Sequence, residues 1–171
     1  MWILIAELFL VVLYALLLVF FFYTFYAFVK AAPFVPTSNH NVEKIIQIAG
    51  LNSTDTMCDL GSGDGRILFL AAKSGAKCVG IEINPILYYF SKFKKLLYRV
   101  DNVEIIRQDL WKIDLAQFDV LTLFFIAPKM EKLMKKIKAE MKPGSRVVSY
   151  AFRFPNWQPT KEDEKVRLYV V

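Results

Sequence analysis

The fold is decided by residues 59–66, which read DLGSGDGR. This stretch follows a short apolar run, residues 57–60, and precedes a segment with the composition of a helix, residues 67–76. Glycines at such a turn let the backbone bend sharply and approach a ligand closely, because a Cβ atom would collide. A strand, a glycine-rich turn and a helix in this order indicate an α/β fold with a ligand site at the end of its first strand.

The composition of this turn restricts the ligand. A dinucleotide-binding turn reads G-x-G-x-x-G, whereas here Gly65 comes one residue early and Arg66 stands at the expected position. The carboxylates of Asp59 and Asp64 would repel a pyrophosphate. They suit a ligand that carries an ammonium group and a carboxylate, as a methionine moiety does.

Acidic residues also follow the next two predicted strands. Glu82 ends the second strand, with Asn84 behind it, and Asp109 follows the third strand. A carboxylate at the position of Glu82 can accept two hydrogen bonds from a ribose diol, and Asp109 can accept one from an exocyclic amine. Together with Asp59 they predict three acidic side chains at the carboxyl edge of the sheet, where open α/β folds bind ligands.

The rest of the chain alternates between apolar runs and helical patterns, which indicates a Rossmann-like, doubly wound, mostly parallel sheet. About twenty residues follow the fifth predicted strand, so we expect one closing strand and an abbreviated sheet. The predicted organisation is a membrane segment (1–30), a linker with a short helix (31–50) and one α/β domain (51–171). The predicted strands are residues 57–60, 78–83, 103–108, 118–126 and 146–152, and the helices are residues 42–49, 67–76, 85–100 and 129–141.

The first thirty residues predict a transmembrane helix. No charged residue occurs from Leu8 to Val29, a length that exceeds the roughly 30 Å hydrocarbon core of a bilayer. Trp2 at one end, and Tyr23 and Tyr26 at the other, suit the two membrane interfaces. A secretory signal peptide is the alternative, but it would need a basic start and a shorter apolar core.

Charge predicts the orientation of this helix. All 22 basic residues lie from Lys30 onwards. The positive-inside tendency therefore places the N-terminus outside and the α/β domain on the cytoplasmic or an equivalent side, as a single-pass membrane protein.

The three strand-tip segments DLGSGDGR (59–66), IEINP (81–85) and RQDLW (107–111) resemble the first three motifs of the class I, seven-strand S-adenosylmethionine-dependent methyltransferases. The resemblance implies that Asp59 and the loop glycines hold the methionine part of S-adenosylmethionine, Glu82 the ribose and Asp109 the adenine. The implied cofactor-binding residues are Asp59, Gly61, Ser62, Gly63, Gly65, Glu82, Asn84, Asp109 and Leu110.

Other segments are similar to one branch of these enzymes, the membrane-anchored protein-lysine methyltransferases that modify the ATP synthase c subunit or the adenine nucleotide translocase. They are the apolar helix and the segments PFVPT (33–37), DLW (109–111) and RFPNW (153–157). The resemblance implies methylation of a lysine in a membrane or membrane-proximal protein. The implied substrate-site candidates are Pro36, Thr37, Ala127, Pro128, Phe154 and Trp157.

The sequence departs from the family pattern after the fourth strand. Many amine and amide methyltransferases of this fold carry an Asp or Asn before prolines there, whereas this chain reads IAPK (126–129). The catalytic residue is therefore unknown. Methylation of a small amphiphile, such as a lipid amine or a quinone, and non-catalytic cofactor binding both stay open. Two lone cysteines give no metal-ligand spacing, and the lysines at 129–138 accompany no nucleic-acid-reading motif, so neither a metal nor a nucleic-acid partner is expected.

Overall fold

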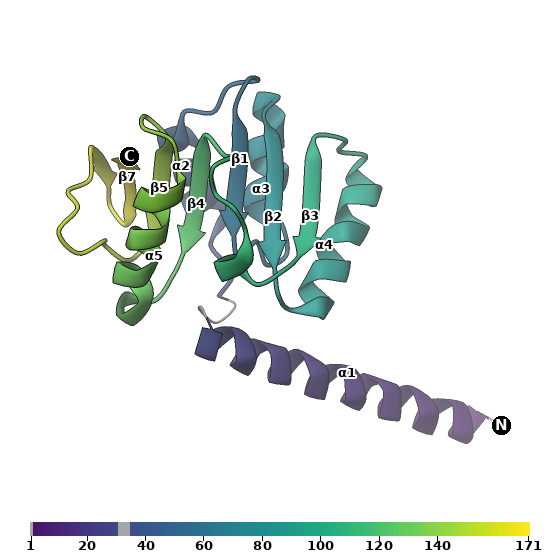
Figure 1. The fold of residues 1–171 in the computed structure, drawn as a ribbon. Coiled ribbons are helices and arrows are strands. Elements are labelled where there is room, and N and C mark those ends of the chain that lie inside the picture. Colours follow the sequence, from purple (N-terminus) through teal and green to yellow (C-terminus); the bar gives the residue numbers. More distant parts are fainter. Residues whose placement is uncertain (1, 31–34) are drawn as a thin grey trace.

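The computed structural model describes residues 2–30 and 35–171, with side chains for 2–26 and 35–171. Pro33 and Phe34, which belong to the expected linker and to the PFVPT segment, lie outside the described residues. The predicted doubly wound α/β fold is confirmed, and one long helix precedes it (Figure 1).

The core is a seven-stranded sheet in the order β3-β2-β1-β4-β5-β7-β6. The strands β1 to β5 run parallel, and β7 pairs antiparallel with both β5 and β6. The order reverses between β1 and β4, which is where a fold of this kind opens a crevice. The strands are β1 (Thr56–Leu60), β2 (Lys77–Glu82), β3 (Val103–Arg107), β4 (Val120–Phe124), β5 (Arg146–Tyr150), β6 (Lys161–Asp163) and β7 (Val166–Val170).

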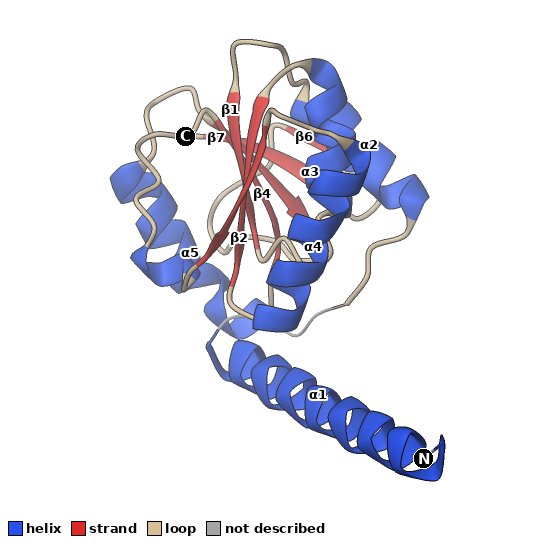
Figure 2. Cartoon of the chain, turned by 90° about the vertical axis from the view of Figure 1, so that its right-hand side faces the viewer, coloured by secondary structure: helices blue, strands red, loops and turns tan. Residues whose placement is uncertain are grey.

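Helices cover both faces of the sheet (Figure 2). The helices α2, α3 and α4 cover one face, and α5 covers the other together with the short η2 turn. This burial on both faces explains why the central strands read as continuous apolar runs. The helices are α1 (Trp2–Lys30), α2 (Asn39–Ala49), α3 (Arg66–Ala71), α4 (Pro85–Tyr98) and α5 (Ala127–Glu140), with 3₁₀ turns η1 (Ala72–Ser74) and η2 (Leu110–Lys112).

The C-terminal part differs from the expectation of one closing strand and an abbreviated sheet. The segment forms two strands, β6 and β7, which complete a seven-stranded sheet. The chain passes from β5 to β6 through the loop 151–160. The strand β6 lies at the edge of the sheet, where Lys161 and Glu162 are exposed, so it has no apolar pattern by which the sequence could show it.

The helix α1 stands apart from the α/β domain and runs past the carboxyl edge of the sheet (Figure 1). Its residues Trp2–Tyr26 form a segment long and apolar enough to cross a membrane. Only its C-terminal part approaches the domain, where the Arg107 guanidinium donates to the Tyr23 hydroxyl at 3.4 Å. The rest of its apolar surface is exposed to its surroundings.

Candidate functional site

A cavity opens at the carboxyl edge of the sheet, next to the C-terminal ends of β1, β2 and β4. Its walls come from the ends of these strands, the glycine-rich turn, the segment before α2 and the helix α1. It therefore lies where the strand order reverses, as expected for a ligand site in this fold. The lining residues are Thr24, Val35, Pro36, Thr37, Asp59, Leu60, Gly61, Ser62, Gly63, Asp64, Arg66, Ile67, Ile81, Glu82, Ile83, Asn84, Leu87, Gln108, Asp109, Leu110, Phe124 and Phe125.

The turn after β1 depends on its glycines. Gly65 has a positive φ of 79°, and a Cβ atom there would lie 2.7 Å from the Phe69 ring. The turn is pinned to the neighbouring strand, because the N–H groups of Gly61 and Ser62 both donate to the Ile81 carbonyl, at 2.9 and 3.1 Å. Main-chain groups of this loop are thereby fixed at the cavity wall.

Glu82 connects the glycine-rich turn to the start of α4. Its Oε2 accepts from the Gly63 N–H at 2.8 Å, and its Oε1 accepts from the Asn84 N–H at 2.7 Å. Burial raises the pKa of this carboxyl, and the hydrogen bonds from Asn84 and Gly63 oppose that rise. Each carboxylate oxygen still has a second lone pair, so Glu82 can accept from two hydroxyl groups of a ligand.

Asp59 is a buried carboxyl beside Glu82. Its Oδ1 accepts from the Thr122 hydroxyl at 2.8 Å. Burial raises its pKa to about 7, and the negative charge of Glu82 acts in the same direction. A ligand cation would offset both effects, so the chemistry of this pair favours a positively charged group in the cavity.

Several buried polar atoms along the cavity have no hydrogen-bond partner among the described residues. They are Ser62 Oγ, Asn84 Nδ2 and Thr24 Oγ1. Buried polar groups in folded proteins are almost always paired. Because their residues line one cavity, a polar ligand bound there could complete their hydrogen bonds.

Asp64 pairs with basic side chains of the protein, whereas its place in the glycine-rich turn suggested a carboxylate that acts on the ligand. Burial acts to raise its pKa, but the Arg66 hydrogen bond and the Lys94 charge hold that pKa below its ordinary value. Its carboxylate contacts Arg66 at 2.9 Å and Lys94 at 3.3 Å. The charge of Asp64 is therefore compensated, and the other acidic residues that line the cavity are Asp59, Glu82 and Asp109. Arg66 also donates to the Thr37 carbonyl, which ties the segment before α2 to the turn.

The structure gathers most of the predicted cofactor residues around the cavity. Asp59, Gly61, Ser62, Gly63, Glu82, Asn84, Asp109 and Leu110 all line it. Gly65 lies just outside the lining, as the N-cap of α3. Asp109 also caps η2, because its Oδ1 accepts from the Trp111 N–H at 3.0 Å.

The predicted substrate residues divide into two groups. Pro36 and Thr37 line the cavity, whereas Ala127, Pro128, Phe154 and Trp157 do not. Ala127 and Pro128 form the first turn of α5. The rings of Phe154 and Trp157 each pack 5.0 Å from the Tyr169 ring, between centroids, and Phe154 is buried in the core.

Two features of the cavity were missed by the sequence analysis. Thr24 lines the cavity from α1. The one feature of the sequence that could have pointed to Thr24 is that no other Ser or Thr occurs between residues 8 and 29. Phe124, at the tip of β4, lines it and packs against Tyr150 and Phe152, with centroid distances of 5.2 and 6.4 Å. Both β4 and β5 end in aromatic residues, but their proximity follows from the strand pairing.

Comparison with known proteins identifies relatives of this chain. The profile of the ANTKMT methyltransferase domain matches residues 59–161, which include the glycine-rich turn and all three acidic strand tips. A protein-lysine N-methyltransferase of Saccharolobus islandicus is 34% identical, over 82% of this chain and 88% of its own length.

Two further proteins show how far the similarity extends. The rat lysine N-methyltransferase of the ATP synthase c subunit is 36% identical over 74% of this chain, which spans 59% of the rat protein's length. The crystal structure of an RNA methyltransferase from Salinibacter ruber, in complex with S-adenosyl-L-homocysteine, superposes with a TM-score of 0.74 at 35% identity. The superposition covers 80% of this chain and 92% of the Salinibacter chain.

Proposed function

The chain belongs to the family of the ANTKMT methyltransferase domain, and we propose that it transfers a methyl group from S-adenosylmethionine to a lysine of a membrane or membrane-proximal protein. The observation that carries this proposal is the cavity at the carboxyl edge, which is lined by two buried carboxyls and by three residues with unpaired polar atoms. The protein-lysine methyltransferases among the relatives support the choice of substrate.

The residues around the cavity fit the three parts of S-adenosylmethionine. Asp59 offers a carboxylate to the ammonium group of the methionine part, and Ser62 Oγ offers an unpaired donor to its carboxylate. Glu82 has lone pairs for the ribose hydroxyls, and Asp109 with Leu110 lines the wall proposed for the adenine. When bound, this cofactor supplies an electrophilic methyl group on a cationic sulfur.

The substrate end of the cavity lies at the tips of β4 and β5. Phe124 lines the cavity there, and the partly exposed rings of Tyr150 and Phe152 pack against it. Pro36 and Thr37 line the same cavity from the segment before α2. Aromatic faces stabilise cationic amines, and a closed site orients the deprotonated amine for attack. We assign no catalytic base.

Three features support a membrane location. The helix α1 is long and apolar enough to span a bilayer, aromatic residues Trp2, Tyr23 and Tyr26 stand near its ends, and all basic residues lie from Lys30 onwards. We therefore propose that α1 anchors the protein with the α/β domain on the cytoplasmic or an equivalent side. An anchored domain meets membrane substrates at a raised local concentration.

The test is the transfer of label from methyl-labelled S-adenosylmethionine. The full chain in bilayer nanodiscs would be incubated with membranes from cells that lack it, and label would be measured in protein, lipid and RNA fractions. Label on lysine in membrane protein is expected, and Asp59→Asn should abolish it while the exposed Glu104→Gln should not.

Other distributions of label would identify other functions. Label in the lipid extract would show a small amphiphilic substrate. Label in RNA would place the chain with the Salinibacter structure, which is described as an RNA methyltransferase. Cofactor binding without transfer to any fraction would contradict methyl transfer as the function.

A further inference from the structure

The outward face of α4 carries large apolar side chains that no part of the described chain covers. Tyr89, Phe93 and Leu96 recur at helical spacing along one stripe, and they are 64%, 61% and 76% exposed. Leu97 lies beside this stripe at 65% exposure. A monomeric soluble protein rarely exposes so many large apolar groups together, so this face marks an interaction surface.

The opposite face of α4 already packs against the domain. Leu87 and Ser91 are buried beneath the helix, and Lys94 reaches inward to the Asp64 carbonyl at 2.9 Å. The exposed stripe is therefore not a core face that has lost its partner. The outer helix of a soluble α/β protein would normally carry polar residues on this side.

Charge points to the chemistry of the missing partner. Residues 85–99 contain no Asp or Glu, and Lys92, Lys95 and Arg99 lie along one flank of the apolar stripe. An apolar stripe flanked by basic residues, with aromatic side chains within it, is typical of helices that lie in the headgroup region of an anionic bilayer. The exposed face of α5 differs, because Lys135 there pairs with Glu131 at 2.7 Å.

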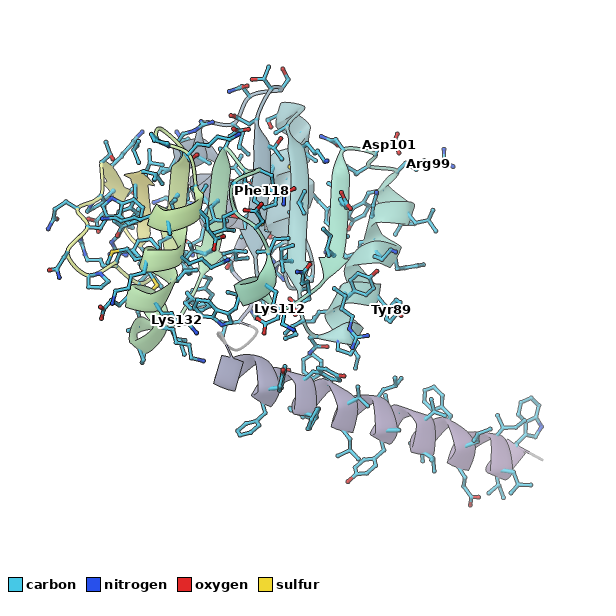
Figure 3. All side chains as sticks on the ribbon, in the orientation of Figure 1. Tyr89, Arg99, Asp101, Lys112, Phe118 and Lys132 are labelled. Carbon is cyan, nitrogen blue, oxygen red and sulfur yellow. The ribbon has the colours of Figure 1, made fainter. Side chains whose placement is uncertain are left out.

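The position of α4 is continuous with the proposed membrane anchor. The helix α1 passes close to α4 and extends away from the domain on the same side as α4 (Figures 1 and 2). Figure 3 shows Tyr89 near the end of α4 that lies towards α1. A bilayer entered by α1 would thus lie against the side of the domain that exposes the apolar stripe.

We propose that α4 is a second, interfacial membrane contact, which inserts Tyr89, Phe93, Leu96 and Leu97 into the headgroup region of an anionic bilayer. This inference rests on the proposed anchoring by α1. Because Asn84 is both the N-cap of α4 and a lining residue, the contact would hold the cavity at a fixed height above the bilayer.

The experiment locates three positions of the full chain in vesicles with and without an anionic lipid. Single cysteines would carry an environment-sensitive fluorophore at Phe93→Cys on α4, Tyr14→Cys on α1 and Lys135→Cys on α5. Cys58 and Cys78 are buried, which favours selective labelling. Quenching is measured with spin-labelled lipid and with aqueous iodide.

The expected result is lipid quenching and a blue-shifted emission at positions 14 and 93, and iodide quenching at position 135. Iodide quenching at position 93 beside lipid quenching at position 14 would overturn the proposal and leave the anchor intact. Iodide quenching at both positions would overturn both. Lipid quenching at position 93 alone would support the α4 contact and contradict the anchor.

Charge variants test the choice of an anionic surface. Each replacement of Lys92, Lys95 or Arg99 by Gln should weaken the binding of α4 to anionic vesicles by about fivefold, or about 1 kcal/mol. The fluorophore at position 93 would report this as a shift from lipid to water. The replacements should have little effect in neutral vesicles. In detergent, protection of position 93 from iodide could increase with protein concentration. That result would identify a second copy of the chain as the partner and overturn the proposal.

Discussion

The main-chain N–H of Gly63 donates to Oε2 of Glu82 at 2.8 Å, so one carboxylate joins the turn after β1 to the tip of β2. The second oxygen of the same carboxylate holds the Asn84 N–H at the start of α4. Glu82 is therefore both a ligand-binding candidate and a positioning group for the loop. Two donors already fix its orientation before a ribose could bind.

This relationship predicts the effect of Glu82→Gln. The amide nitrogen of Gln cannot accept a hydrogen bond, so one of the two main-chain N–H groups that donate to Glu82 would lose its acceptor. We expect the Kd for S-adenosylmethionine to rise tenfold or more, equivalent to about 1.4 kcal/mol, in calorimetry. The matched control is Glu104→Gln on the exposed side of β3, and an equal Kd in both variants would contradict the role of Glu82.

The buried carboxyl of Asp59 predicts a pH dependence of stability. Its pKa is about 7 in the folded protein, against about 3.9 in an unfolded chain. The folded state binds this proton more tightly, so the free energy of unfolding should fall as the pH rises from about 4 to about 7, by on the order of 3 kcal/mol. Chemical denaturation at several pH values checks this, and Asp59→Asn should show a smaller decrease across the same range.

A cationic ligand should show the opposite trend with pH. An ammonium group beside Asp59 favours the ionised carboxylate, so the affinity for S-adenosylmethionine should increase between about pH 5 and pH 7. The dependence should weaken in Asp59→Asn. An affinity that is flat with pH in both proteins would show that the ammonium does not bind Asp59.

The unpaired hydroxyl of Thr24 predicts a contribution from α1 to cofactor binding. Thr24→Val keeps the shape of the side chain and removes the hydroxyl, so it should weaken cofactor binding by about two- to tenfold. Tyr14→Phe removes an exposed hydroxyl from the same helix and is the control. Calorimetry in nanodiscs compares the two, and unchanged binding by Thr24→Val would exclude this hydroxyl from the site.

The contacts of Arg146 lie away from the cavity, so we expect its substitution to change the free energy of unfolding and to leave the site unchanged. Its Nη1 donates to the Ala49 and Gly50 carbonyls at the end of α2, at 2.7 and 2.6 Å, and its Nη2 contacts Asp55 at 2.6 Å. Arg146→Ala should lower the free energy of unfolding by about 2–3 kcal/mol without changing cofactor affinity. Arg153→Ala, which removes an exposed ion pair, should cost less than about 1 kcal/mol. Urea denaturation distinguishes them.

Local sequence predicted those parts of the site that depend on local chemistry. The glycine-rich turn and the strand tips at Glu82 and Asp109 are read from short segments, and the parallel sheet brings their side chains to one edge. The long apolar segment was likewise recognisable as a helix from its own residues.

Contacts between distant segments could not be predicted in the same way. The compensation of Asp64 by Lys94 depends on how α4 packs, thirty positions along the chain. The edge strand β6 is polar and exposed, so no hydrophobic periodicity shows it. Thr24 lines the cavity because the C-terminal part of α1 lies at the carboxyl edge of the sheet, and no residue within α1 specifies that position.

The place of Thr24 in the cavity wall has a consequence for the proposed membrane anchoring. A spanning helix adapts to bilayers of different thickness by changing its tilt. A change in the tilt of α1 would move Thr24 relative to the glycine-rich turn and alter the shape of the cofactor cavity. If α1 spans a bilayer as proposed, cofactor affinity would then differ between short-chain and long-chain lipids, and the activity of the site would depend on the thickness of the bilayer.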